Sequence, residues 1–384
     1  MNAPAKIPFI DLAAQQGRLR AELDRALARV LDEGAYIMGP DVRRFERELA
    51  DFCGAKHVLA CGNGTDALQL ALMALGVGPG HAVFVPSFTF AATAEVVPLL
   101  GATPVFVDCR ADTFNMDPAS LERAIAHARS LGLEPKTVVP VDLFGLPADM
   151  PAIEAIAAEN GIDVLCDSAQ GFGGTIGGKM TGTFGRVSTT SFFPAKPLGC
   201  YGDGGAIFTD DDDLAALIDS LRVHGKGSDK YDNVRIGLNS RLDTLQAAIL
   251  SVKLSVYRSE IEARDRVAER YNARITNLVD TPRPPAGYGS VWAQYTVKLT
   301  SGEERTAVQA TLGESGVPTA VYYPMPLHLQ TAYRDYPQDP DGLPVSEDLS
   351  ARVLSLPMHP YLTEEVQDYI IEAFNSAVLA ARGA

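Results

Sequence analysis

Lys196 is the residue in this sequence best placed to form a covalent bond. It follows the apolar, β-prone run 187–193 and precedes the glycine-rich turn Gly202–Gly205. That position limits contact with water. Because desolvation lowers the pKa of an amine, the neutral amine can attack an aldehyde to form a Schiff base, and pyridoxal phosphate is the usual aldehyde. The structural alternative is a lysine that extends from a strand end to the surface.

A glycine-containing loop, Gly62-Asn63-Gly64-Thr65, suits the binding of a phosphate group. It lies between a predicted strand and a predicted helix. The two glycines let the backbone approach an anion, the start of the helix offers free N–H groups, and Thr65 adds a hydroxyl. On its own the motif is equally consistent with an ordinary helix cap.

Two further segments supply groups for a pyridine ring. Asp167 follows the predicted strand 164–166, at the edge where α/β sheets bind ligands. A carboxylate there keeps a pyridine nitrogen protonated, so that the ring accepts electrons. Phe90 follows the predicted strand 82–85 and can stack on the ring, whereas Phe88 is expected to pack in the core. A helix cap is the alternative for Asp167.

The elements that must position these groups are short apolar strands alternating with helices. This alternation predicts an α/β fold with a mostly parallel central sheet covered on both faces. Predicted strands cover 58–61, 82–85, 105–107, 138–141, 164–166, 187–193 and 206–209. Predicted helices cover 66–75, 91–100, 118–128 and 151–160, and acidic residues 210–213 open another.

The C-terminal third predicts a smaller α/β domain. A long helical region, 241–278, connects it to the rest, and a proline-rich loop follows at 282–289. Beyond the loop we expect strands at 291–299 and 319–322, and helices at 304–312 and 364–382. We therefore predict a large domain at 1–250 and a small domain at 251–384.

Composition excludes several classes of function. The 384 residues carry 33 Lys and Arg against 48 Asp and Glu, a net charge of −15, which argues against binding to nucleic acid or anionic membranes. The five cysteines are scattered, and no Cys/His pairing suggests a metal site; reduced thiols in a cytoplasmic protein explain them. Residues 1–11 lack a signal-peptide pattern, and no apolar stretch is long enough to span a bilayer.

Phosphate loop, aromatic residue, aspartate and lysine occur in this order, each at a predicted strand end. In this order they resemble the DegT/DnrJ/EryC1/StrS family of pyridoxal-phosphate-dependent sugar aminotransferases. The resemblance runs from Phe9-Ile10-Asp11-Leu12 to Leu356-Pro357-Met358-His359-Pro360. It implies an aspartate aminotransferase-like fold (fold type I) and a homodimer with active sites shared between subunits.

The resemblance also implies a role for each cofactor-binding residue. Lys196 is similar to the lysine that binds the cofactor and shuttles protons; relatives with histidine there act as dehydratases, so lysine favours transamination. Asp167 corresponds to the partner of the pyridine nitrogen, and Gln170 to the contact with the ring hydroxyl. Phe90 corresponds to the residue that stacks on the ring. Gly64, Thr65 and Ser191 correspond to the phosphate ligands, and Asn239 corresponds to an asparagine that reaches the phosphate of the neighbouring subunit.

The resemblance is strongest to enzymes acting on UDP-2-acetamido-2-deoxy-3-oxo-glucuronate, with glutamate as the amine donor, in bacterial O-antigen synthesis. A uronate needs a cation, and Arg241 can bind a carboxylate through two parallel bonds; an ion pair with Asp243 is the alternative. Other positions matching substrate contacts are Gly34, Tyr36, Ala195, Tyr322, Tyr323 and His328. His328 is equally consistent with a structural role.

Two departures bear on the substrate. Tyr322 stands where relatives often carry histidine, and Ala195 stands where they often carry serine. One alternative is therefore amination at C4 or C3 of a nucleotide-linked keto-6-deoxyhexose, which offers no carboxylate to Arg241. The other is a non-catalytic regulatory protein of the same fold, although Lys196 and Asp167 are both present and no DNA-binding segment is.

Overall fold

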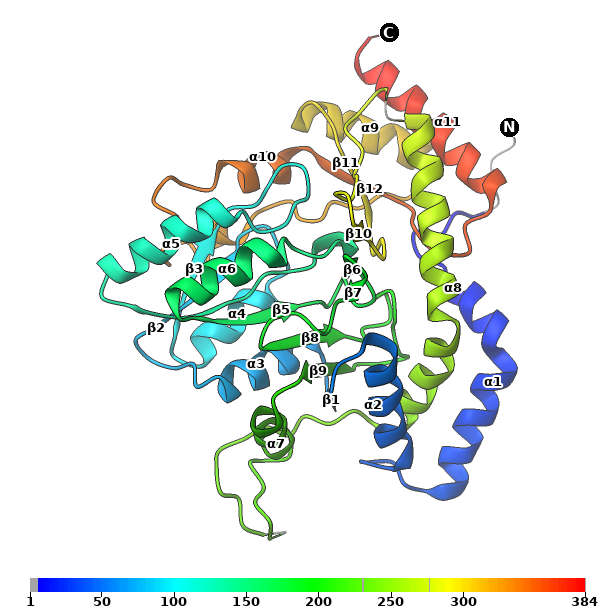
Figure 1. Ribbon diagram of the computed structural model, residues 1–384. Helices are drawn as coiled ribbons and strands as arrows, with labels where there is room; N and C mark the ends of the chain where they lie inside the picture. Colours follow the sequence, from blue (N-terminus) through cyan, green and yellow to red (C-terminus); the bar gives the residue numbers. More distant parts are fainter. Residues whose placement is uncertain (1–5, 230, 276, 384) are drawn as a thin grey trace.

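A seven-stranded sheet forms the centre of the computed structural model, which describes residues 6–229, 231–275 and 277–383 (Figure 1). The strand order is β1-β9-β8-β5-β4-β2-β3. The bounds are His57–Cys61 for β1, His81–Pro86 for β2, Thr103–Val107 for β3, Glu134–Val138 for β4, Asp163–Asp167 for β5, Val187–Ser191 for β8 and Gly205–Thr209 for β9.

One strand, β9, runs against the others. It pairs antiparallel with both β1 and β8, so β1 and β8 run in the same direction. The remaining neighbours, β8-β5, β5-β4, β4-β2 and β2-β3, pair in parallel. The carboxyl ends of β1, β2, β5 and β8 therefore meet at one edge, and the segments that follow them carry the predicted site residues.

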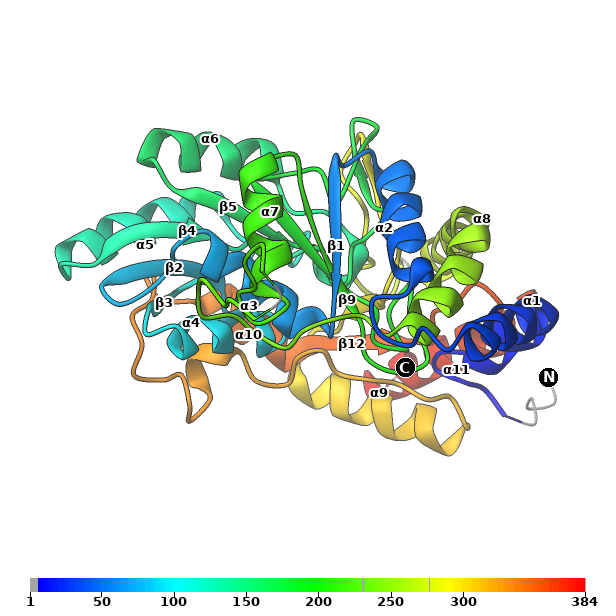
Figure 2. The same ribbon diagram turned by 90° about the horizontal axis from the view of Figure 1, so that it is seen from below.

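Helices cover both faces of the sheet because side chains alternate along each strand. Val83 and Val85 pack in a buried cluster with α3, α4 and α7, whereas Ala82 and Phe84 pack with α5 and α6 on the opposite face (Figure 2). The helix bounds are Gly64–Ala74 for α3, Ala92–Leu99 for α4, Pro118–Ser130 for α5, Met150–Asn160 for α6 and Asp212–Leu221 for α7.

The N-terminal part adds two helices, α1 (Leu12–Glu33) and α2 (Pro40–Cys53). Both pack against the first half of α8 (Thr244–Ile275), and α2 also covers the β1-β9 end of the sheet. Residues 1–5, the start of the segment in which no signal peptide is expected, lie outside the described residues. Within the described residues, no helix combines the length and apolarity needed to cross a membrane.

The second half of α8 enters a separate hydrophobic cluster. There it packs with the two-stranded sheet β11 (Tyr295–Lys298) and β12 (Val353–Leu356), and with α9 (Gly302–Glu314) and α11 (Glu364–Ala381). Three short strands form a third sheet: β6 (Thr175–Ile176), β7 (Lys179–Met180) and β10 (Tyr288–Gly289). The remaining elements are α10 (Pro344–Arg352) and short 3-10 turns at Leu143–Gly145 and Leu327–Leu329. Residue 250 lies inside α8, and the division into two domains near it stays a prediction.

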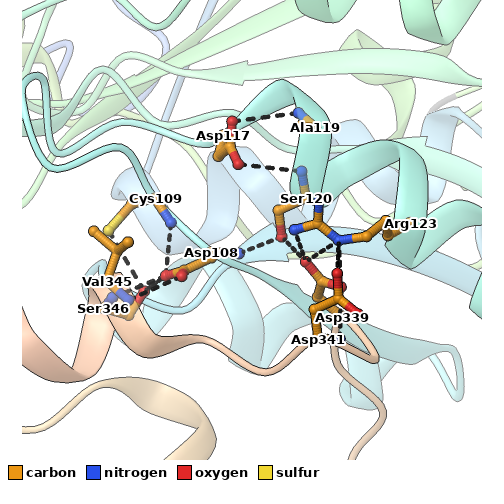
Figure 3. A network of polar contacts seen from close by, with 10 residues as sticks. All are labelled: Asp108, Cys109, Asp117, Ala119, Ser120, Arg123, Asp339, Asp341, Val345 and Ser346. Carbon is orange, nitrogen blue, oxygen red and sulfur yellow. Dashed lines mark hydrogen bonds and ion pairs between the residues drawn. The ribbon is translucent and has the colours of Figure 1, made fainter.

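A polar network joins α10 to the end of β3 (Figure 3). The carboxylate of Asp108 accepts hydrogen bonds from the backbone N–H groups of Val345 and Ser346, at 3.0 and 2.8 Å, and so caps the start of α10. Arg123 and Ser120 of α5 both donate to the buried carboxylate of Asp339. Burial opposes its charge, but these two bonds lower the pKa of Asp339.

Beside this network, the segment 337–339 extends the edge of the sheet. The N–H of Phe106 donates to the carbonyl of Pro337, and the N–H of Asp339 donates to the carbonyl of Phe106, both at 2.9 Å. Gln338 pairs in parallel with Phe106. Part of the C-terminal third therefore pairs with β3, although that strand belongs to the large sheet.

Most predicted elements are found within a few residues, with three exceptions. Predicted strand 138–141 begins earlier, as β4 (Glu134–Val138). Beyond β4, Pro140 lacks an N–H for the ladder, but Val141 still makes an isolated parallel bridge to Asp167. Predicted strand 319–322 makes one isolated bridge, Ala320 to Ser355. The sequence analysis predicted neither α10 nor β12, which lie side by side in the chain.

Candidate active site

Asp167 and Lys196 lie at the ends of neighbouring strands. Asp167 is the last residue of β5, and Lys196 follows β8, the strand that pairs with β5. Asp167 is 4% exposed, and burial raises the pKa of its carboxyl. Lys196 is partly exposed as a residue, yet burial lowers the pKa of its amine. The charge of Asp167 partly offsets this lowering, and the charge of Lys196 partly offsets the raised pKa of Asp167. The site therefore couples a desolvated amine to a desolvated carboxylate.

The predicted phosphate loop begins α3. Asn63 caps the helix, since its side chain accepts from the N–H of Asp66 at 2.8 Å. Gly64 and Thr65 are the first two residues of α3, and the first N–H groups of a helix have no acceptor inside it. Asn63 thus serves as a cap while the adjacent N–H groups point out of the helix end, so the cap and anion-site interpretations are compatible.

Gly64 has a steric reason to be glycine. A Cβ atom there would lie 2.7 Å from the Cβ of Ser191, the last residue of β8. Without that atom, the helix start and the Ser191 hydroxyl approach each other. Gly64 and Ser191 are therefore in close contact, and Thr65 is the next residue of α3. These three predicted phosphate contacts form a candidate phosphate cradle, with the helix-start N–H groups and hydroxyls that suit a phosphate group.

The residues that were predicted to contact the pyridine ring of the cofactor gather around Tyr323. Gln170 donates from Nε2 to the Tyr323 hydroxyl at 3.1 Å, while its Oε1 accepts from the N–H of Phe144 at 2.9 Å. Phe90 is 57% exposed, and its ring centroid lies 6.5 Å from that of Tyr323. Phe88 is buried edge-on to the same tyrosine. Phe88 packs in the core, whereas the ring of Phe90 is exposed, and its stacking on the cofactor stays a prediction.

The predicted substrate residues fall into two groups. Tyr36 and Arg241 are close in the fold, because Ile37 pairs with Asp243 and the N–H of Thr244 donates to the carbonyl of Tyr36 at 2.9 Å. Gly34, which ends α1 with φ +67°, precedes this pairing.

The second group lies by the cofactor residues. Ala195 is in the turn that carries Lys196, and Tyr322 precedes Tyr323. The ring of Tyr322 lies 6.4 Å from that of Phe9, centroid to centroid. The structure therefore places the N-terminal segment near the second group.

His328 is buried between two polar partners. Its Nδ1 lies 2.6 Å from the hydroxyl of Ser87, and its Nε2 lies 3.2 Å from Oε1 of Glu347. Both ring nitrogens are therefore engaged within the protein. This geometry supports the structural alternative for His328, and its predicted contact with substrate stays a prediction.

Asn239 is exposed, and its neighbour Ser240 is buried. The Ser240 hydroxyl accepts from the N–H of Gly62 at 2.9 Å, so this segment is fixed to the phosphate loop of its own chain. The backbone of Asn239 pairs with Val223. Asn239 is therefore exposed beside the phosphate loop of its own chain, and its contact with a neighbouring subunit stays a prediction.

Two contacts were missed by sequence reasoning. Thr93 of α4 donates to Asp167 at 2.9 Å, and the N–H of Phe144 holds Gln170. Thr93 lies within an apolar helix and Phe144 contributes only its backbone, so neither position carries a pattern that sets it apart. Both become visible only when the strand ends are brought together.

The comparisons with known proteins identify the family of the chain. The sequence profile of the DegT/DnrJ/EryC1/StrS aminotransferase family matches residues 18–375. The UDP-2-acetamido-2-deoxy-3-oxo-D-glucuronate aminotransferase of Pseudomonas aeruginosa is 50% identical over 93% of this chain and 96% of its own. A protein of Geobacillus stearothermophilus named pleiotropic regulatory protein is 43% identical over 95% of this chain and 97% of its own.

Solved structures give the same result. The crystal structure of a DegT DnrJ EryC1 StrS aminotransferase from Brucella abortus has 55% identity and a TM-score of 0.95, and the match covers 96% of this chain and 99% of that one. Aminotransferases of this family depend on pyridoxal phosphate, and structural neighbours are solved with PLP or PMP. The chain belongs to the DegT/DnrJ/EryC1/StrS aminotransferase family.

Proposed function

We propose that this enzyme is a pyridoxal-phosphate-dependent transaminase that moves an amine from glutamate to C3 of UDP-2-acetamido-2-deoxy-3-oxo-glucuronate, for O-antigen or related polysaccharide synthesis. The observation that carries the proposal is that Lys196, in the turn after β8, and the buried Asp167, at the end of the neighbouring β5, are close enough for each charge to shift the pKa of the other. The 50% identity to the Pseudomonas aeruginosa enzyme supports this substrate.

The chain's own residues divide the work. Gly64, Thr65 and Ser191 hold the phosphate, and Asp167 holds the proton of the ring nitrogen. Burial lowers the pKa of the Lys196 amine, which favours the neutral form that would bind the cofactor covalently; once released by substrate, the amine would remove a proton and return it. When bound, the cofactor supplies the electron sink and carries the amine between the two substrates.

A homodimer with shared sites is part of the proposal. Three apolar side chains, Tyr231, Val234 and Ile236, are 85%, 52% and 88% exposed on the segment 224–239 that ends at Asn239. Exposed apolar side chains clustered on a projecting segment favour burial against another chain. Because Ser240 contacts Gly62 of its own chain, an action of Asn239 within its own subunit is the alternative.

Mixed dimers test the shared site. Lys196→Ala and Asn239→Asp subunits should each be inactive, the second because a carboxylate repels the phosphate. If the sites are shared, a mixed dimer contains one site with both native residues. We therefore expect mixing to restore about a quarter of wild-type activity, since half the dimers are mixed and each has one of two sites intact.

Subunit exchange must be verified, for example by differently tagged chains. Asn233→Asp places the same charge elsewhere on the segment and should leave activity near the wild-type level. Full exchange without recovery, from two inactive parents, would assign Asn239 to its own subunit.

Arg241 is the feature that favours a uronate. It is partly buried beside the 34–37 segment, and among the ion pairs of the described residues none joins it to Asp243. The guanidinium is therefore not committed to the ion pair that was the structural alternative. It is available to hold a sugar carboxylate through two parallel hydrogen bonds.

Replacing Arg241 with alanine or lysine should impair turnover of the 3-oxo-glucuronate sugar. Loss of a charged contact costs about 2–5 kcal/mol, or roughly 30- to 5000-fold in kcat/KM. Lysine keeps the charge but loses the planar fork, so it should rescue only in part. The glutamate half-reaction and a keto sugar without the C6 carboxylate should change far less.

Arg20→Lys, an exposed change in an ion pair with Asp24, is the control and should have no effect. Equal losses on sugars with and without the carboxylate would assign Arg241 to structure instead.

The function itself is tested by incubating the enzyme with cofactor, glutamate and a panel of UDP-, dTDP- and GDP-linked keto sugars, and reading the products by mass. Amination of the 3-oxo-glucuronate sugar in preference to the others is expected. A preference for a keto-6-deoxyhexose would instead support amination at C4 or C3 of such a sugar. Failure to aminate any sugar, despite covalent binding of the cofactor, would favour a regulatory role such as the name of the Geobacillus relative suggests.

We place the enzyme in the cytoplasm. All five cysteines are unpaired and buried. Reduced thiols persist in a compartment where glutathione and thioredoxin keep them so.

A further inference from the structure

Thr93 makes the one side-chain hydrogen bond to Asp167 among the described residues. Its Oγ1 donates to Oδ2 of Asp167 at 2.9 Å, and the N–H of Ala169 donates to Oδ1 at 3.1 Å. Thr93 is 1% exposed and Asp167 4%. Each carboxylate oxygen thus has its own donor from the protein, which fixes the plane of the carboxylate.

A second hydroxyl continues the chain of contacts. Oγ1 of Thr89 lies 3.4 Å from Oγ1 of Thr93. Because Thr93 donates its hydroxyl proton to Asp167, Thr89 is the donor in this longer contact. Phe90 lies between the two threonines, and the N–H of Thr93 donates to its carbonyl at 3.3 Å. One short segment therefore carries both the stacking ring and the hydroxyl that orients the carboxylate.

We propose that Thr93 is a positioning residue for amine transfer: it orients the Asp167 carboxylate toward the ring nitrogen and keeps the proton of that pair on the ring. This inference rests on the proposed transaminase function. A hydrogen bond to an ionised carboxylate stabilises its charge. Without the Thr93 hydroxyl, Asp167 becomes a stronger base and draws the shared proton from the ring, which weakens the electron sink.

The environment of Asp167 makes the hydroxyl important. Burial raises the pKa of this carboxyl, whereas the hydrogen bond from Thr93 lowers it, as do the N–H of Ala169 and the charge of Lys196. A buried charge depends on the few donors that face it, because water does not replace a lost one.

Thr93→Val removes the hydroxyl at nearly unchanged volume, and Thr93→Ser retains it. Thr93→Val should lower kcat for the glutamate half-reaction roughly tenfold, the scale of one hydrogen bond to a charged group, with a smaller change in KM. Thr93→Ser should restore most of the loss. Thr89→Val, which deletes a buried hydroxyl that does not touch Asp167, is the matched control and should stay within about twofold.

Two readouts separate positioning from mere structure. The cofactor is labelled with nitrogen-15 in the ring, and the NMR chemical shift of this nitrogen is measured. It should move toward the value of the unprotonated ring in Thr93→Val but not in Thr89→Val. Reconstitution with 1-deazapyridoxal phosphate, which has a C–H in place of the ring nitrogen, should abolish the difference between Thr93→Val and wild type in slow single turnovers. The effect of the hydroxyl passes through that nitrogen.

An equal loss with the natural and the deaza cofactor, or an unchanged nitrogen shift, would overturn the proposal, as would full activity of Thr93→Val. Failure of the proposed function would instead show as a wild-type protein that transfers no amine from glutamate. Thermal unfolding of each variant identifies a loss that comes from misfolding. If Thr93→Val misfolds, Thr93→Ala, which also lacks the hydroxyl, decides by the chemical shift of the ring nitrogen.

Discussion

The Lys196→Ala variant is expected to keep its fold and lose amine transfer. The proton that Lys196 removes and returns would then have no acceptor, and acid–base groups of this kind contribute roughly 10²- to 10⁴-fold to the rate. The phosphate cradle of Gly64, Thr65 and Ser191 remains, so the cofactor still binds without a covalent bond. Turnover, the absorbance of the bound cofactor and thermal unfolding check the three parts of this expectation.

Borohydride treatment identifies the covalent bond directly. In the wild type it should fix the cofactor on the peptide that contains Lys196, as read by mass, and in the variant it should fix none. Lys56→Ala, at an exposed lysine paired with Asp212, is the control and should behave as the wild type. Substantial amine transfer by pure Lys196→Ala protein would refute the assignment.

The Asp167→Asn variant should also retain its fold and lose most of its activity. A neutral amide is too weak a base to hold the ring nitrogen in its protonated form, so the ring becomes a poor electron sink. The lost charge-assisted hydrogen bond is worth about 1.5–3 kcal/mol, which corresponds to roughly 10- to 150-fold in rate. Single turnovers with glutamate, together with the cofactor content, measure the effect.

Asp163→Asn is a matched control at the opposite end of the same strand. Asp163 begins β5 and forms an ion pair with the partly exposed Arg186, away from the site edge. That variant should remain close to the wild type. If Asp167→Asn kept normal turnover and normal cofactor content, Asp167 would act only as a cap for the turn that follows it, through its bond to the N–H of Ala169.

The sequence was sufficient to predict that Asp167, Ser191 and Gly64 lie at one edge of the sheet, because strand ends in a mostly parallel sheet converge there. Asp167 ends β5, Ser191 ends β8 and Gly64 begins α3, so their approach follows from the order of the strands. The roles of the residues came from the resemblance to a family rather than from spacing. Those roles stay predictions until the variants are measured.

Other features depend on contacts that no local pattern encodes. Thr93 sits in an apolar helix like any core residue, and only the packing of α4 on the central sheet, next to β2 and β3, brings its hydroxyl to Asp167. The start of α10 is capped by Asp108, more than 230 residues earlier in the chain, so a search for caps nearby in sequence finds none. β9 pairs antiparallel with β8 after the connection 192–204, which contains no helix, and the apolar run alone does not reveal this direction.

The pairing of residues 337–339 with β3 has a consequence for the order of synthesis. The strands of the central sheet leave the ribosome before residue 210, but the partner of Phe106 at the sheet edge is made more than 200 residues later. Until then β3 is an open edge with unpaired N–H and C=O groups, a template for pairing with another chain. Truncations before residue 337 should therefore aggregate although every strand of the sheet is present, because the segment that closes this edge lies in the last eighth of the polypeptide and is made only near the end of translation.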